Sequence, residues 1–136
     1  MRGVVLLLFL AAACEDRSYR DIGAEINVLT TRTDALVPPA MKRLAKYRRR
    51  AIPQIEIALH TASPAGKVNL VRALEAIGDR EATPILRHFA VYDPDPAVRT
   101  TCEEILGSWG AGEALARIKE LRAKGEGPVV IGERKN

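Results

Sequence analysis

Leu74-Glu-Ala-Ile77-Gly78-Asp-Arg-Glu81-Ala82 is followed, 32 residues later, by a second copy of the same pattern, Leu106-Gly-Ser-Trp109-Gly110-Ala-Gly-Glu113-Ala114. The same offset aligns Leu86 with Ile118 and Phe89 with Leu121, and a fainter copy begins at Ala51. Self-similarity at a period of about 20–50 residues indicates a solenoid, because one helical hairpin cannot bury its apolar stripe alone. The sequence therefore predicts an all-α fold, a short α-solenoid of about three stacked helical hairpins.

The residues between the apolar stretches predict where the helices begin and end. Gly78 and Gly110 are placed to end the first helix of a hairpin, since glycine adopts the left-handed conformation without steric cost. Ser63-Pro64-Ala-Gly-Lys-Val68 aligns with Asp93-Pro94-Asp-Pro-Ala-Val98, and each stretch opens a helix with a residue able to cap it and an early proline. We expect helices over 20–33, 38–50, 52–61, 65–77, 81–91, 96–108 and 112–124, followed by an extended or mobile tail over 125–136, in which Val129-Val130-Ile131 is able to dock on the last helix.

Composition supports a helical core without large rings. Hydrophobic residues make up 47% of the chain but aromatic residues only 4%, so the core is expected to consist of Leu, Ile, Val and Ala. The formal net charge of +4 is too small an excess to argue for nucleic acid.

The N-terminus has the order of residues of a secretory signal. Arg2 precedes eleven uncharged residues, 3–13, which is too few to span a bilayer, and Cys14 follows. Leu10-Ala11-Ala12-Ala13-Cys14 resembles the lipobox of bacterial lipoproteins, in which the chain is cut before the cysteine and the sulfur receives a diacylglycerol. Ala11 occupies the usual leucine position of that motif. The alternatives are an ordinary cleaved signal and a buried N-terminal helix.

This resemblance implies four segments and a location. Residues 1–13 are the signal peptide, 14–35 a lipid-anchored segment with a capping helix, 36–124 the repeat domain and 125–136 the tail. Acyl chains on Cys14 place the protein in the cell envelope, on the periplasmic side of a membrane. Glu15 replaces the aspartate that retains lipoproteins in the inner membrane of enteric bacteria, which favours the outer membrane. Cys102 is then the one free thiol, and its apolar neighbours indicate a core residue.

The repeated segment also resembles a known family. Leu70 through Leu86, and then Asp93-Pro94-Asp95-Pro96-Ala97-Val98-Arg99, resemble HEAT repeats, and in particular the short HEAT-like type of bilin lyases. The resemblance covers about residues 51–124. It implies a structural role for Arg99, which in such repeats commonly ties neighbouring repeats together through a carboxylate. Asn69 stands at the equivalent position of the preceding copy.

No residue pattern indicates catalysis, a metal or a cofactor. His60 and His88 are the only histidines, and they stand 28 positions apart rather than at the spacing of ligands on one helix. We interpret His88 as a surface or hairpin-edge residue. The alternating prolines make Asp93 and Asp95 turn and capping residues, with cation binding or catalysis as the alternative.

One polar cluster stands out. Six basic residues fall within nine positions: Lys42, Arg43, Lys46, Arg48, Arg49 and Arg50. On a continuous helix Lys42, Lys46, Arg49 and Arg50 would share one face, opposite Val37, Met41, Leu44 and Ala51. Such a strip can attract anionic lipid, an acidic protein or an anionic envelope polymer, or it can be an ordinary solvated helix face.

Trp109 is the sole tryptophan and aligns with the core position Ile77. It is either a core residue or an anchor for a partner, since tryptophan is enriched at binding hot spots. Taken together, the sequence predicts a non-catalytic, membrane-anchored lipoprotein that binds another protein. An electrostatic binder of anionic membrane or polymer and an enzyme or lyase subunit are the alternatives.

Overall fold

The computed structural model describes the backbone of residues 2–32 and 34–129, and the side chains of residues 17–32 and 34–129. The helices are α1 (Arg2–Thr31), α2 (Val37–Ala45), α3 (Ile52–Leu59), α4 (Pro64–Ile77), α5 (Thr83–Tyr92), α6 (Pro96–Ser108) and α7 (Gly112–Ala123), with short 3₁₀ turns η1 (Arg48–Ala51) and η2 (Arg80–Ala82). No strand occurs in these ranges. The prediction of an all-helical solenoid is confirmed.

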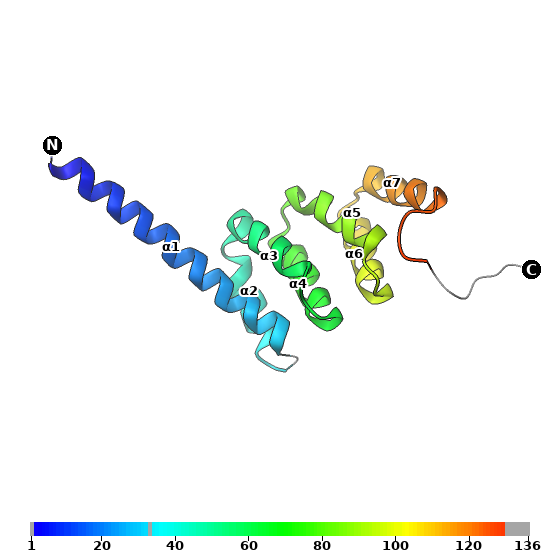
Figure 1. Cartoon of the computed structure of the whole chain (residues 1–136), viewed down its shortest axis with the longest axis horizontal. Helices are drawn as coiled ribbons and strands as arrows, with labels where there is room; N and C mark the ends of the chain where they lie inside the picture. The colour runs from blue at the N-terminus through cyan, green and yellow to red at the C-terminus, as the bar shows by residue number, and fades with distance from the viewer. Residues whose placement is uncertain (1, 33, 130–136) are drawn as a thin grey trace, which may run out of the picture.

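The helices form three antiparallel hairpins, α2/α3, α4/α5 and α6/α7, stacked side by side (Figure 1). Helices α2, α4 and α6 pack in one layer, while α5 and α7 pack in the other. The second half of α1 covers the first end of the stack, where it contacts α2, α3 and α4. This arrangement gives each hairpin a neighbour that shares its apolar stripe.

The predicted start and stop signals are confirmed at the central helices. The Ser63 hydroxyl accepts the Gly66 N–H at 3.3 Å, and the Asp95 carboxylate accepts the Ala97 N–H at 2.8 Å, with a proline at the start of each helix. Gly78 ends α4 with φ +69° and Gly110 follows α6 with φ +66°. A residue other than glycine would be strained at both turns.

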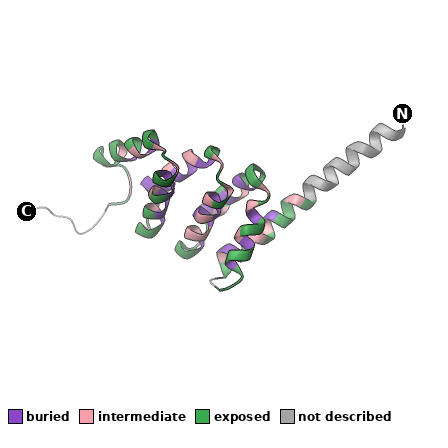
Figure 2. Ribbon diagram, turned by 180° about the vertical axis from the view of Figure 1, so that it is seen from behind, coloured by how far each residue is buried: buried purple, intermediate pink, exposed green. Residues whose placement is uncertain are grey.

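Aliphatic side chains fill the space between the two layers, as Figure 2 shows by the buried residues on the inner faces of the helices. Leu70, Leu74, Leu86 and Leu106 are completely buried, and each such side chain contributes about 1.5–3 kcal/mol of hydrophobic free energy. Cys102 is part of this core, and burial raises the pKa of its thiol to about 12. The thiol is therefore neutral and acts as a small apolar residue.

The chain between α2 and α3 departs from the prediction of one helix over residues 38–50. Helix α2 ends at Ala45, and Arg48 has φ +51°, which reverses the chain before α3 begins. The interpretation that Lys42, Lys46, Arg49 and Arg50 share the face of a single helix is therefore wrong. A left-handed residue interrupts the helical rotation, so spacing in the sequence no longer sets direction in space.

The predicted signal peptide, residues 1–13, and the lipidation site Cys14 lie outside the residues whose side chains are described. Among the described residues, no helix combines the length and the apolar character that crossing a membrane requires. In the tail, Val129 is 87% exposed and does not dock on α7, whereas Gly127 lies against the Val91 carbonyl of α5. Residues 130–136 are outside the described range.

Candidate binding surfaces

The turns of the three hairpins lie along one edge of the stack and contact one another. We call residues 46–51, 78–82 and 109–111 the turn edge. Arg49 joins the first turn to the second, because its Nε donates to Asp79 at 3.2 Å and its Nη1 lies 3.0 Å from Glu81. The pKa of Asp79 is held below its usual value, first by the backbone N–H of Glu81 and then by Arg49.

Arg80 joins the second turn to the third. Its Nη1 donates to the Trp109 carbonyl oxygen, and its guanidinium carbon lies 5.4 Å from the centre of the Trp109 ring. Trp109 is half-buried against the core, so it combines packing with partial exposure. The structure thus places Trp109 on the same edge as Lys46, Arg49 and Arg50, which the sequence did not indicate.

The basic side chains of this region fall into two groups. Arg43 is engaged by α1, since its Nε donates to Glu25 at 2.7 Å and its Nη2 donates at 3.0 Å, and this hydrogen bonding raises its pKa. Arg49 is paired as described above. The remaining four, Lys42, Lys46, Arg48 and Arg50, are exposed and form no ion pair within the described part of the chain. Binding by Lys42, Arg43, Lys46, Arg49 or Arg50 stays a prediction.

The connections between hairpins form the opposite edge, which we call the cap edge (residues 60–63 and 93–95). There Lys67 donates to Asp93 at 2.7 Å, and their side chains are only 13% and 1% exposed. Asp93 also accepts the Asp95 N–H at 2.9 Å, so the prediction of turn and capping roles for both aspartates is confirmed. The Asp93 carboxylate therefore ties two neighbouring repeats together through its bond to Lys67.

The family resemblance implies that Arg99 ties neighbouring repeats together through a carboxylate, and this prediction is wrong. Arg99 donates to the carbonyl oxygens of Asp93 at 2.8 Å and Pro94 at 3.0 Å, and therefore ties the turn rather than a carboxylate. The buried Asp93 carboxylate is instead paired with Lys67. Asn69, at the equivalent position, donates to the Leu29 carbonyl at 2.9 Å and fastens α4 to α1.

A second surface was not found from the sequence. His60 at the end of α3 meets α5, with ring centroids 6.2 Å from His88 and 5.3 Å from Phe89. His88 in turn lies 5.0 Å from Tyr92. We call Ile57, His60, His88 and Tyr92 the ring face, with the buried Phe89 beneath it. Ile57 is 67% and Tyr92 40% exposed, and His88 is at the surface, as predicted.

The ring face is held together by contacts between rings from two helices. In the described part of the chain, no three His, Cys, Asp or Glu side chains come together as metal ligands. His60 and His88 are separated by 28 positions and lie on different helices, so no spacing rule for one helix could pair them. Only the stacking of α3 beside α5 brings these rings together.

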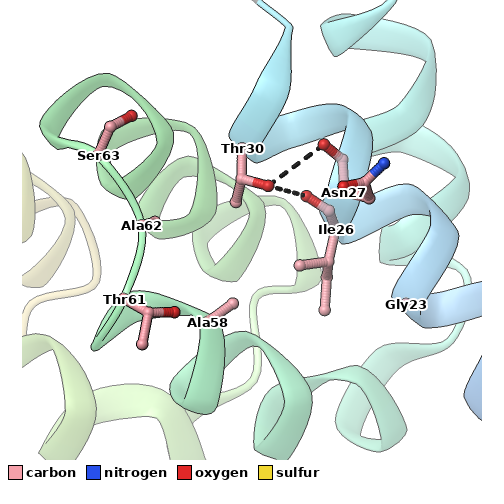
Figure 3. Close-up of a pocket in the computed structure, with 8 residues that line it drawn as sticks. All are labelled: Gly23, Ile26, Asn27, Thr30, Ala58, Thr61, Ala62 and Ser63. Atoms are coloured by element: carbon pink, nitrogen blue, oxygen red, sulfur yellow. Dashed lines mark hydrogen bonds between the residues drawn. The ribbon is translucent and has the colours of Figure 1, made fainter.

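A shallow groove of about 440 Å³ lies between α1 and α3 (Figure 3). It is lined by Gly23, Ile26, Asn27, Thr30, Ala58, Thr61, Ala62 and Ser63. The Thr30 hydroxyl points back to its own helix, where it donates to the Ile26 carbonyl at 3.1 Å and to that of Asn27 at 3.2 Å. With no titratable side chain in its lining, the groove offers no group for acid–base chemistry.

Comparison with protein families gives one match. The family model described as HEAT repeats matches residues 52–134, which is more than half of the chain. No curated protein and no solved structure matches significantly.

Proposed function

The chain belongs to the family of HEAT repeats, and from this premise we propose that it is a membrane-anchored scaffold that binds another protein through its ring face. HEAT repeats generally mediate protein interactions. Stacked hairpins suit this task because they present a continuous surface that crosses several repeats.

The exposed rings of His60, His88 and Tyr92 are the observation that carries the choice of surface. Together with Ile57 they form a contiguous strip over two hairpins, whereas monomers normally expose large apolar side chains singly. Tyrosine and other rings are favoured at hot spots because they bury a large area with few rotatable bonds. We therefore expect the partner to present an apolar or aromatic anchor to this strip.

The membrane anchor of the proposal is supported by the sequence of the N-terminus. Leu10-Ala-Ala-Ala-Cys14 provides the lipidation motif, and acylation of Cys14 would hold the scaffold at the periplasmic side of a membrane, with Glu15 favouring the outer one. Confinement to one membrane raises the effective concentration of the scaffold toward partners in the same layer.

A non-catalytic role fits the chemistry of the described residues. Asp93 is held by Lys67, and His60 and His88 contact rings rather than carboxylates. These three side chains are therefore not arranged as a pair that exchanges a proton with a substrate.

The test is affinity capture of the tagged full chain from its native membranes, with mass spectrometry of the recovered proteins. The wild type should recover one partner in near-equal amount. His88→Ala combined with Tyr92→Ala should weaken that binding by about 30-fold, as expected for a hot spot. Lys119→Ala, on α7, is the matched surface control and should retain the partner. Equal recovery by all three chains would overturn the ring face as the binding site.

A further inference from the structure

The turn edge lies toward the N-terminal part of α1. Gln54, at the start of α3, is beside Gly23, whereas Ala58 and Ala62 line the groove with Ile26 and Thr30. Helix α3 therefore runs parallel to α1, and the turn that precedes it lies beyond Gly23 in the direction of Arg17 (Figure 1). The cap edge lies at the other end, near Thr30 and Ser63.

Free positive charge is concentrated on this edge. Lys46, Arg48 and Arg50 are exposed at the tip of the first turn, and no described carboxylate pairs with them. On the cap edge, by contrast, Lys67 is buried against Asp93 and Arg99 is bonded to backbone carbonyls. The positive φ of Arg48 produces this tip. It prevents α2 from continuing beyond Ala45, so these side chains project from a sharp turn.

We propose that the turn edge docks on an anionic lipid surface and so sets the orientation of the solenoid on its membrane. This inference rests on the proposed anchor at Cys14. Gly23 is nine helical positions from Cys14, about 14 Å along α1. The basic tip lies on the side of Gly23 that faces Cys14, so it is directed toward the anchored membrane, whose charge attracts cations over about 8 Å at physiological salt.

The shape of the edge favours a lipid surface over other anionic partners. Three turns in a row, joined by Arg49 and Arg80, form an extended rim, and the hollow beside Gly110 and Ala111 at its third turn is not lined by the basic residues of the tip. The two rings of the rim, Tyr47 and Trp109, are both partly buried, so neither offers an open face on which nucleic-acid bases could stack. With the rim on the membrane, the ring face would point away from it and be free for a protein partner, because His60 and Tyr92 lie at the far ends of α3 and α5.

Trp109 provides the experiment, because it is the sole tryptophan and lies on the rim. The full chain, purified from membranes, is reconstituted into vesicles of phosphatidylcholine alone or with phosphatidylglycerol. Both contain a trace of lipid with a nitroxide on its headgroup, which quenches nearby tryptophan. We expect stronger quenching of Trp109 on the anionic vesicles, and loss of the difference in 1 M salt, where the screening length falls to about 3 Å.

Two variants of equal charge locate the effect. The double variant Lys46→Gln with Arg50→Gln should lower the ratio of docked to undocked protein by about 30-fold. This value follows from the usual attraction of two cations to an anionic surface. Arg32→Gln with Lys119→Gln removes the same charge away from the rim and should leave the quenching unchanged. Equal loss in both variants would overturn the assignment to the turn edge.

Two further measurements test the lipid anchor at Cys14 and the docking of the turn edge separately. The intact mass shows whether Cys14 carries lipid, and a chain without lipid overturns the anchor and the inference together. A lipidated chain that is quenched equally on both kinds of vesicle overturns the inference alone. Equal quenching together with tight binding of a soluble anionic polymer would instead assign the edge to such a polymer.

Discussion

The two edges of the solenoid are built from turns of similar length but have opposite properties. On the cap edge, the Lys67–Asp93 pair is almost completely buried, and the aspartates bond to backbone N–H groups. On the turn edge, the Arg49 side chain is 66% exposed, and Lys46, Arg48 and Arg50 have no partner among the described residues. The Lys67–Asp93 pair therefore stabilises the stacking of hairpins, whereas the basic side chains at the tip of the turn edge remain available to other molecules.

The largest test of this difference is Asp93→Ala on the cap edge. The change leaves the Lys67 ammonium buried without its carboxylate, which costs about 3–5 kcal/mol in comparable sites. We expect a loss of this size in the free energy of unfolding, measured by urea denaturation with circular dichroism. Asp93→Asn keeps an acceptor for the Asp95 N–H and should lose less. If Asp93→Ala lowers the free energy of unfolding by no more than the loss of a simple helix cap, the buried ion pair does not stabilise the cap edge as described.

Capping residues provide a smaller contrast between the same edges. Asp95 caps the 13-residue helix α6, whereas Asp79 caps only the three-residue turn η2. Asp95→Ala should cost about 1 kcal/mol of stability, and Asp79→Ala clearly less. Thermal or urea unfolding of the two variants in parallel is the measurement. A larger loss at Asp79 would show that the turn edge contributes more to the fold than its exposure indicates.

Arg48 allows a test in which the turn edge becomes more stable. Relief of the left-handed strain at φ +51° outweighs the greater freedom of glycine in the unfolded chain, so Arg48→Gly should stabilise by about 0.5 kcal/mol. Arg50→Gly is the control, because its backbone has no positive φ and glycine there should destabilise. If Arg48→Gly lowers the stability, the strain does not exist in solution.

The smallest expected effect is on the titration of Asp79. Its pKa is lowered, so its contribution to stability is present above the usual aspartate pKa and is lost as the pH falls through the lowered value. Arg49→Gln should raise the pKa only partly toward normal, because the Glu81 N–H is the larger cause. NMR titration of the Asp79 carboxyl group measures this change. An unchanged pKa would show that Arg49 does not bridge the two turns in solution.

Most of the fold could be predicted because its signals are local. Gly78 and Gly110 end helices, Ser63 and Asp95 begin them, and the recurring leucines mark the faces that must be buried. The break at Arg48 was missed because arginine favours helices and no glycine or proline marks the turn. Its cause is tertiary, since α3 must turn back to pack beside α1 and α4.

The candidate surfaces were likewise only partly predictable from the sequence. The basic residues were visible as a cluster in the sequence, but their pairing was not, because Glu25 and Asp79 come from other helices. The contacts of His60 with His88 and Phe89, and the Lys67–Asp93 pair, join residues 26 to 29 positions apart, which are neighbours only after stacking. By itself, the sequence determined where helices form and which faces are apolar, since those depend on contacts within a few residues. The tertiary structure alone decided which charges are neutralised and which rings meet, because these depend on distances between helices.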